Sequence, residues 1–348
     1  MEFRINKRLI GPGHPTYVIA EMSGNHNQSY EKAVEIIHAM KASGADAVKI
    51  QTYTADTITL KSDRPEFRIG GGTLWDGKTL HELYSDAYTP WDWQPKLQKV
   101  AQDLGMDFFS TPFDPTAVEF LEKMHVPAYK IASFEVTDIP LIQKIAATGK
   151  PVIMSTGMAN IAEITEAVDA VRSTGNTQLA LLKCTSAYPS PPESMNLETI
   201  RDMQKRFNVP VGLSDHTLGI VVPVAAVALG ACIVEKHFCI SHSEPGPDSA
   251  FSLEPQEFRA MVDAIRVAEK ALGTIAYGAS VHEEANVTFR RSLFAVEDIA
   301  EGEILTEKNV RSIRPGHGLP PKELTKVIGK KAKGKIAKGT PLAWDHIT

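Results

Sequence analysis

PVGLSDH (Pro210–His216) and CIVEKHF (Cys232–Phe238) decide the fold, because each is a short, mostly apolar run that ends in polar or charged residues. Most such runs along the chain are continuous rather than alternating, which is typical of parallel strands buried on both faces. Most are separated by about 20 to 30 residues of helical periodicity, the spacing of repeated βα units. Six earlier segments belong to the series: YVIAE (Tyr17–Glu21), AVKIQ (Ala47–Gln51), DFFSTP (Asp107–Pro112), AYKIAS (Ala128–Ser133), PVIMST (Pro151–Thr156) and LALLKCT (Leu179–Thr185).

Eight βα units predict an α/β protein built on a closed (β/α)₈ TIM barrel. Several predicted helices end at a glycine just before the next strand, as in SGADAVKI and LGMDFF, and such a glycine is a helix stop signal. A doubly wound open sheet is the alternative. It is disfavoured because no G-x-G-x-x-G follows the first predicted strand, and GPGHP (Gly11–Pro15) does not have that spacing.

The chain has 348 residues, enough for one large domain and a small one. From Phe289 onward there are 12 Lys and Arg against 7 Asp and Glu, whereas the rest of the chain has 25 against 35. This shift in charge indicates a domain boundary. The C-terminal part also repeats itself, in IAEGEIL (Ile299–Leu305) and IAKGTPL (Ile336–Leu342), as small β-rich folds with glycine turns do. We expect a barrel over residues 1–272, a linker over 273–288 and a small β-rich domain over 289–348.

Composition bounds the partners and the compartment. The basic residues of the C-terminal part are not interleaved with aromatic residues, so no nucleic-acid partner is expected. The three cysteines have no regular spacing, which fits a reducing compartment. The N-terminal residues lack the pattern of a signal peptide. The longest apolar stretch, Ile220–Val234, contains Pro223 and Gly230 and is too short to span a bilayer. We read it as a buried helix that leads into a buried strand, and we expect a cytoplasmic protein without a membrane partner.

One interval is longer than the others. The insert Thr52–Pro90 lies between the second and third predicted strands and is rich in Gly and Thr. A long loop of this kind on the active face of a barrel is typical of a lid or a substrate-selecting segment, although it can also be a functionless insertion.

Polar residues gather at the carboxyl ends of all eight predicted strands, where barrel enzymes carry their active sites. Charged residues in buried strands are costly unless they have partners, so this pattern indicates a functional cluster. The set comprises Glu21, Lys49, Gln51, Ser110, Thr111, Lys130, Ser133, Ser155, Thr156, Thr185, Ser214, Asp215, His216, Glu235, Lys236 and His237.

Two kinds of chemistry fit this cluster. His216 and His237 end adjacent predicted strands, and two neutral imidazoles suit Mn²⁺, Fe²⁺, Co²⁺ or Zn²⁺, with Glu21 or Asp215 adding carboxylate character. Lys49 and Lys130, with Ser133, Ser155 and Ser214, suit a phosphate and a carboxylate. A metal beside an anion site indicates metal-assisted condensation of a small phosphorylated acid. A Schiff-base aldolase with Lys130 or Lys49 as nucleophile stays open on the residues alone.

At these residues the sequence resembles the sialic acid synthase family, and the likeness runs through nearly the whole chain. Within the family, IGGGTLWDGKTLHELY in the insert and the FSLEP segment look most like the members that make pseudaminic acid. The matching motifs are IAEMSGNHN (Ile19–Asn27), AVKIQTY (Ala47–Tyr53), FSTPFD (Phe109–Asp114), AYKIASFE (Ala128–Glu135), STGM (Ser155–Met158), KCTSAYP (Lys183–Pro189), GLSDHT (Gly212–Thr217), EKHF (Glu235–Phe238) and PGPD (Pro245–Asp248).

The resemblance implies that phosphoenolpyruvate joins the open-chain aldehyde of an N-acetylated sugar, with water consumed and phosphate released by C–O cleavage. His216 and His237 would hold a divalent metal, typically Mn²⁺, with Mg²⁺ or Co²⁺ as alternatives. Glu21 would transfer a proton or stabilise the developing positive charge at the reacting carbon. Residues for phosphoenolpyruvate would be Lys49, Thr111, Lys130, Ser133, Ser155 and Ser214, and further substrate contacts would be Gln51, Phe113, Glu135, Tyr188 and Asp248. In such a family Lys130 acts as a charge and not as a nucleophile.

The C-terminal part resembles the antifreeze-like (SAF) domain of the same family. SIRPGHG (Ser312–Gly318) matches the segment whose arginine, here Arg314, reaches into the partner subunit's site. A planar guanidinium suits an N-acyl carbonyl or a carboxylate. The resemblance thus implies a domain-swapped homodimer. A non-catalytic sugar-binding protein is the remaining alternative, but such a chain should have lost some of the site residues, and Glu21, Lys49, Lys130, His216 and His237 are all present.

Overall fold

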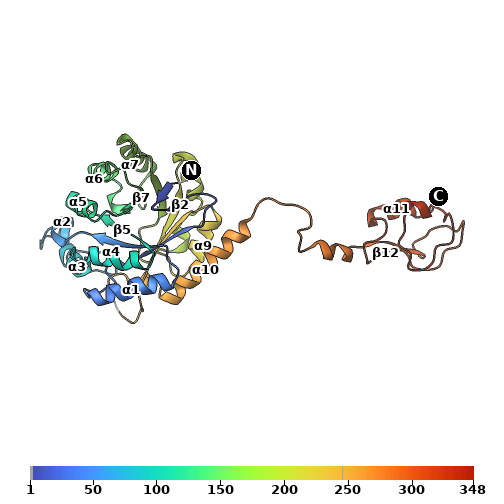
Figure 1. The fold of residues 1–348 in the computed structure, drawn as a ribbon. Coiled ribbons are helices and arrows are strands. Elements are labelled where there is room, and N and C mark those ends of the chain that lie inside the picture. The colour runs from blue at the N-terminus through green and yellow to red at the C-terminus, as the bar shows by residue number, and fades with distance from the viewer. Residues whose placement is uncertain (1–2, 245) are drawn as a thin grey trace. The chain divides into compact units, whose positions relative to one another are not determined.

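A computed structural model describes residues 3–244 and 246–348, which form two compact units. One unit runs to Gly273 and the other from Thr274 to Thr348, a division that falls next to the expected end of the barrel at residue 272. In the first unit eight parallel strands close into a barrel in the order β10-β3-β4-β5-β6-β7-β8-β9 (Figure 1). They are β3 (Tyr17–Glu21), β4 (Ala47–Thr52), β5 (Asp107–Pro112), β6 (Tyr129–Ile131), β7 (Val152–Ser155), β8 (Leu179–Cys184), β9 (Val211–Asp215) and β10 (Ile233–His237). The closed barrel confirms the predicted fold and excludes the doubly wound sheet.

A helix packs on the outside of the barrel after each strand (Figure 1). Local signals set the ends of these helices: at the first, the Ser29 side chain accepts the Lys32 N–H, and Gly44 follows the last turn with φ of +88°. The eight helices are α1 (Tyr30–Ala42), α4 (Gln94–Asp103), α5 (Pro115–Lys123), α6 (Ile139–Ala146), α7 (Ile161–Ser173), α8 (Thr199–Phe207), α9 (Val221–Ala228) and α10 (Pro255–Leu272).

An N-terminal hairpin, which the sequence did not predict, packs at the amino ends of the strands. It consists of β1 (Phe3–Ile5) and β2 (Arg8–Ile10). Its Asn6 side chain bonds to Asp107 Oδ1 at 2.5 Å, and Tyr17 bonds to the other oxygen of Asp107 at 2.7 Å. Asp107 and Tyr17 are the first residues of β5 and β3, so the hairpin lies at the end of the barrel opposite the polar strand ends.

The insert between β4 and α4 is an ordered segment with its own secondary structure. It contains α2 (Ala55–Ile58), a 3-10 turn at Pro65–Phe67 and α3 (Leu80–Ala87). Both short helices begin with a threonine in a capping box, at Thr54 and Thr79, which satisfies backbone N–H groups that a helix start leaves free. The insert therefore presents side chains from defined positions.

The second unit is a small fold with its own apolar core. Strands β11 (Ser292–Ala295) and β12 (Val310–Ile313) pair antiparallel, and a short helix, α11 (Leu324–Val327), follows. The two repeated segments meet, because Ile299 and Ile336 form an antiparallel bridge. Their equivalent positions are thus paired in space, in agreement with the predicted internal repeat.

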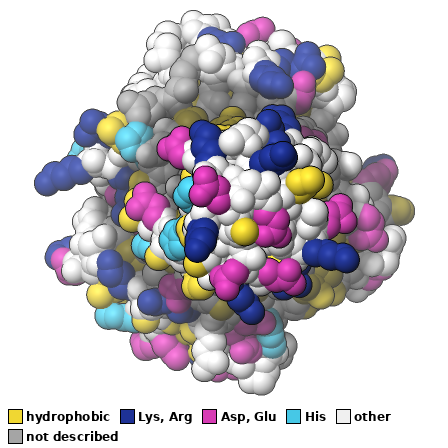
Figure 2. Space-filling model, turned by 90° about the vertical axis from the view of Figure 1, so that its right-hand side faces the viewer, with side chains coloured by type: hydrophobic (Ala, Val, Ile, Leu, Met, Phe, Trp, Pro, Cys, Tyr) yellow, Lys and Arg dark blue, Asp and Glu magenta, His cyan; other side chains and the backbone are white. Residues whose placement is uncertain are grey.

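The structure contains no membrane-spanning candidate among the helices of the described residues. The apolar stretch Ile220–Val234 forms α9 and the start of β10, as predicted. The strand is buried, but α9 is only partly buried, and its Val221 is 77% exposed. On the face drawn in Figure 2, Lys and Arg side chains are interspersed with Asp and Glu.

Candidate active site

Four ionised side chains converge at the carboxyl ends of the barrel strands. Glu21 ends β3, Lys49 lies in β4, Lys130 in β6 and Glu235 in β10, and none is more than 4% exposed. The Lys49 ammonium lies 2.9 Å from Glu21 Oε2 and 3.1 Å from Glu235 Oε1. The Lys130 ammonium lies 3.7 Å from the same Glu235 oxygen. Two carboxylates and two ammonium groups thus form one buried, charge-balanced cluster, which offsets the cost of desolvating each ion.

Hydroxyl groups surround the two lysines. Lys130 Nζ donates to Ser155 Oγ at 2.7 Å, and Ser214 Oγ donates to Glu235 Oε1 at 3.2 Å. Ser133 Oγ accepts the Gly157 N–H at 3.0 Å. Within the part of the chain that the structure describes, the buried Thr111 hydroxyl and the second oxygen of Glu235 have no hydrogen-bond partner. Buried polar atoms without partners are rare in native proteins, so these two atoms indicate room for a polar ligand.

Electrostatics separates the two carboxylates. Burial raises the pKa of Glu21, with the Glu235 charge adding to the effect, and Lys49 only partly opposes it. Burial would also raise the pKa of Glu235, but Lys130 and Lys49 outweigh it and hold that pKa below its usual value. Two acids whose environments push their pKa values apart are typical of a site that moves protons. Glu21 is the better proton carrier, and Glu235 is the permanent anion.

His216 and His237 stand side by side next to this cluster, with ring centroids 5.3 Å apart. The carbonyl of Thr185 lies 3.1 Å from His216 Nδ1, which favours a proton on that nitrogen and leaves Nε2 with its lone pair. Burial lowers the pKa of His237 well below its ordinary value, so its ring is neutral. Its buried Nδ1 lacks a hydrogen-bond partner among the described residues, and Asp248 Oδ2 lies 3.7 Å away.

These two imidazoles fit the implied divalent metal as a partial ligand set. Neutral rings with an available nitrogen are what such a cation binds. The described residues do not include a group of three or more His, Cys, Asp or Glu side chains placed to hold an ion by themselves. A metal here would therefore take its remaining ligands from water and substrate oxygens.

Residues expected to contact the sugar lie around the histidines and the insert. Tyr188 packs on His216 at 4.5 Å and on Phe251 at 5.2 Å. Gln51 donates to Glu21 Oε1 at 3.2 Å and so orients Glu21. Burial raises the pKa of Glu135 to about 7.

An aromatic group connects the insert with the neighbouring strand ends. Tyr53, which follows β4, packs on Phe113 at 5.3 Å and on Tyr84 of α3 at 5.6 Å. The Glu135 charge helps to raise the pKa of Tyr84, after burial, so the insert approaches Glu135 from this side. The insert thus reaches the residues of the catalytic face and is more than a distant surface loop.

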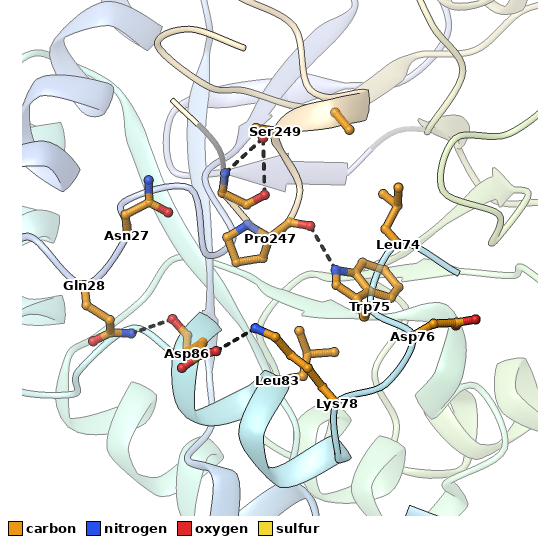
Figure 3. A pocket seen from close by; sticks show the side chains of 12 residues that line it. Asn27, Gln28, Leu74, Trp75, Asp76, Lys78, Leu83, Asp86, Pro247 and Ser249 are labelled. Atoms are coloured by element: carbon orange, nitrogen blue, oxygen red, sulfur yellow. Dashed lines mark hydrogen bonds and ion pairs between the residues drawn. The ribbon is translucent and has the colours of Figure 1, made fainter. Parts of the chain in front are cut away.

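A cavity of 640 Å³ opens between the insert and two other loops of the same face (Figure 3). It is lined from the loop after β3 by Asn27 and Gln28, from the insert by Leu74, Trp75, Asp76, Lys78, Leu83 and Asp86, and from the loop after β10 by Gly246, Pro247, Ser249 and Ala250. Trp75 donates its indole N–H to the Pro247 carbonyl at 3.0 Å and packs on Tyr188 at 5.7 Å. The cavity therefore adjoins the site at Trp75.

Not every polar strand end contributes to the site. Lys236 and Asp215 form a fully buried ion pair at 2.5 Å, and Asp215 also accepts a hydrogen bond from the Thr217 hydroxyl. They alternate with Glu235 and Ser214 along β10 and β9 and so face away from the barrel interior. The oxygens of Asp215 are thus engaged by Lys236 and Thr217, and Asp215 acts on the histidines through its charge, which helps to raise the pKa of His216. Ser110 also points away from the site: its hydroxyl bonds to the Thr52 hydroxyl, which in turn donates to Gln94 on α4.

Glu235 is the residue whose importance sequence reasoning underrated. It had been noted among the polar strand ends but not assigned to the site, although it bridges both lysines. Its place two residues before His237, on the same face of β10, is the signal that would have identified it. Arg314 follows β12 in the second unit and is exposed. Its expected role in a partner's site stays a prediction.

Comparison with known proteins agrees with this geometry. Residues 36–277 match the NeuB family and residues 290–348 match the SAF domain. Pseudaminic acid synthase of Campylobacter jejuni subsp. jejuni serotype O:23/36 (strain 81-176) is 48% identical over 94% of this chain and 95% of its own length. Pseudaminic acid synthase of Helicobacter pylori (strain ATCC 700392 / 26695) is 44% identical over 96% of this chain and 98% of its own length.

A solved structure shares both fold and sequence with the chain. The N-acetylneuraminic acid (sialic acid) synthetase of Leptospira borgpetersenii serovar Hardjo-bovis, in complex with citrate, superposes with a TM-score of 0.74 and 29% identity. The match covers 82% of this chain and 95% of that one. By its matched family, its SAF domain and its full-length relatives, this chain belongs to the NeuB family of sialic acid synthases.

Proposed function

We propose that the chain condenses phosphoenolpyruvate with 2,4-diacetamido-2,4,6-trideoxy-L-altrose and water to give pseudaminic acid and phosphate. The observation that carries the proposal is the buried cluster of two lysines and two glutamates beside a pair of buried histidines. The names and the 44–48% identity of the relatives support the choice of pseudaminic acid as the product.

The lysines and hydroxyl groups suit phosphoenolpyruvate. This substrate brings about two negative charges on its phosphate and one on its carboxylate at neutral pH. Lys49 and Lys130 supply the charge that such groups need, and Ser155, Ser214 and the unpartnered Thr111 hydroxyl supply hydrogen bonds. Because Glu21 and Glu235 already balance the two lysines, binding three further negative charges calls for additional positive charge.

A divalent cation held by His216 and His237 supplies that charge and, when bound, polarises the sugar aldehyde as a Lewis acid. We propose Mn²⁺ as this ion, with Mg²⁺ or Co²⁺ as substitutes. The histidines would contribute imidazole nitrogens, and His216 is oriented by the Thr185 carbonyl.

Glu21 is the residue best suited to proton transfer. Burial raises its pKa, so it accepts a proton more readily than Glu235 does, and Gln51 and the Ser23 N–H orient its Oε1. Glu235 holds Lys49 and Lys130 at fixed positions. The lysines then orient phosphoenolpyruvate, and burial excludes bulk water from the reacting carbons.

The working unit that we propose is a domain-swapped homodimer in which Arg314 reaches the partner subunit's site. Its exposure and the planar array of donors on its guanidinium group are compatible with recognition of an N-acyl carbonyl. The three cysteines are all unpaired in the structure, which supports a reducing compartment such as the cytoplasm.

Phosphate release tests the proposal. We expect release only when phosphoenolpyruvate, the diacetamido trideoxy sugar and Mn²⁺ are all present, and we expect EDTA to abolish it. No release in the complete mixture, with release when N-acetylmannosamine replaces the sugar, would reassign the chain to N-acetylneuraminate synthesis. Activity on the isomeric legionaminate precursor alone would reassign it to legionaminate synthesis, and activity that survives EDTA would remove the metal.

A further inference from the structure

The tip of the insert is a self-contained loop that holds Trp75 in one place. The Asp76 carboxylate accepts the N–H groups of Gly72 and Thr73 at 2.8 and 2.9 Å. Backbone bonds join Ile69 to Lys78 at 2.9 Å and to Gly77 at 3.1 Å. Gly72 and Gly77 have φ of +86° and +92°, values that side chains disfavour, so the glycines permit this closure. The run IGGGTLWDGK therefore folds into a closed loop that holds the Trp75 indole in a defined position.

The Trp75 indole lies between the cavity and the catalytic face. One part of it lines the cavity, and its N–H is bonded to the Pro247 carbonyl (Figure 3). Its ring packs on Tyr188. An indole has a single polar hydrogen and no acceptor. Because Pro247 takes that hydrogen, the rest of the ring presents an apolar surface.

An aromatic row runs from this surface to the histidines. Ring centroids are 5.7 Å apart between Trp75 and Tyr188 and 4.5 Å apart between Tyr188 and His216. Phe251 packs on Tyr188 at 5.2 Å and on His237 at 4.9 Å. The row therefore connects the apolar face of Trp75 with the histidines. An open-chain sugar whose aldehyde lay beside the histidines would extend its last carbons along this row.

We propose that Trp75, with Tyr188, is the specificity element for the far end of the sugar and selects a C6 methyl group over a C6 hydroxymethyl group. The inference rests on the proposed function, since it assumes that a sugar aldehyde binds beside His216 and His237. A methyl group gains by leaving water for the indole face. A hydroxyl group at the same position loses its hydration and finds the indole N–H already bonded. Discrimination of this kind is worth on the order of 100-fold in kcat/KM.

The test compares two acceptors that differ only at C6: 2,4-diacetamido-2,4,6-trideoxy-altrose and its 6-hydroxy counterpart. Each is assayed with phosphoenolpyruvate and Mn²⁺ on the full chain and on W75A, W75F and W91A. Trp91 is the matched control because its indole N–H also bonds a backbone carbonyl, that of Tyr53, at 3.1 Å. Its ring, however, packs on Phe120 and not on Tyr188.

We expect W75A to lower the 6-deoxy to 6-hydroxy ratio of kcat/KM by at least about tenfold, with the KM for phosphoenolpyruvate unchanged. W75F keeps an apolar ring without the N–H, so it should keep most of the ratio while raising both sugar KM values together. W91A should leave the ratio unchanged whatever it does to stability. Circular dichroism shows whether each variant is folded. If W75A is not folded, W75F provides the test, because its ratio and its two sugar KM values should follow the pattern just given.

Two results separate the inference from the proposed function. Suppose that the full chain uses the 6-deoxy acceptor, alone or together with the 6-hydroxy acceptor. If W75A then shows the same 6-deoxy to 6-hydroxy ratio of kcat/KM as the full chain, the role of Trp75 is wrong and the proposed function stands. If the full chain uses neither acceptor, the proposed function fails and the inference fails with it. A loss of selectivity in W91A equal to that in W75A would also overturn the role, because it would show a general effect of loosening the insert.

Discussion

Replacing Lys49 by methionine should destabilise the barrel strongly and make its stability depend on pH. Lys49 bridges Glu21 at 2.9 Å and Glu235 at 3.1 Å in a buried setting. In the variant, Glu235 keeps Lys130 and Ser214, but Glu21 loses its cation. Leaving one buried charge without its partner costs about 3–5 kcal/mol. For a domain of this size the cost corresponds to a fall in Tm on the order of 10 °C.

The sign of the pH dependence follows from Glu21. Its pKa is already raised by burial, and without Lys49 it rises further, so the folded variant binds a proton that the unfolded chain has released. Stability is then lost as pH rises from the unfolded pKa towards the folded one. Thermal unfolding should therefore show a larger deficit relative to the unmodified chain at about pH 8 than at about pH 5.

Adding Glu21→Gln to Lys49→Met provides the internal check. Glutamine removes the orphaned charge, so the double variant should be more stable than K49M at about pH 8. Equal stability of K49M and the unmodified chain at both pH values would refute the linked cluster. A double variant less stable than K49M would refute the assignment of the penalty to Glu21.

Three further outcomes are expected. His237→Ala should abolish Mn²⁺ binding in calorimetry and lower kcat by more than about 100-fold, with the circular dichroism spectrum retained; full activity would remove the metal assignment. Glu135→Gln should stabilise the chain by up to about 3 kcal/mol at about pH 8 and by much less at about pH 5. The reason is that burial raises the Glu135 pKa from 4.5 to about 7, so the ionised carboxylate destabilises the folded state at the higher pH. A change in Tm that does not depend on pH would contradict this. Borohydride should trap no substrate adduct on Lys130, whose ammonium donates to Ser155 and the Ile131 carbonyl, and a mass shift at Lys130 would favour Schiff-base chemistry.

The barrel could be predicted because its strands are apolar on both faces and repeat at a regular interval. All eight observed strands lie within or extend by one residue the predicted segments, as with Val211–Asp215 inside Pro210–His216 and Ala47–Thr52 beyond Ala47–Gln51. The N-terminal hairpin was missed because three-residue strands carry too little periodicity. Its apolar residues, Phe3, Ile5 and Ile10, are recognisable only by the core that they join.

The sequence predicted that the site lies at the polar strand ends, but it did not predict which of these side chains contact one another. Which polar residues face inward depends on the register of each strand, and a shift of one residue exchanges the two faces. This is why the sequence alone did not show that Asp215 pairs with Lys236 or that Glu235 joins Lys49 and Lys130. The contacts of Trp75 with Tyr188 and Pro247 join segments more than 100 residues apart, and no local pattern encodes such contacts.

The most direct test of the account is mass spectrometry of the product formed from phosphoenolpyruvate and a panel of acetamido and diacetamido hexoses in the presence of Mn²⁺. We predict one product, with the mass of pseudaminic acid, from 2,4-diacetamido-2,4,6-trideoxy-L-altrose. Production of N-acetylneuraminic acid from N-acetylmannosamine, with no product from the diacetamido trideoxy sugar, would contradict the account.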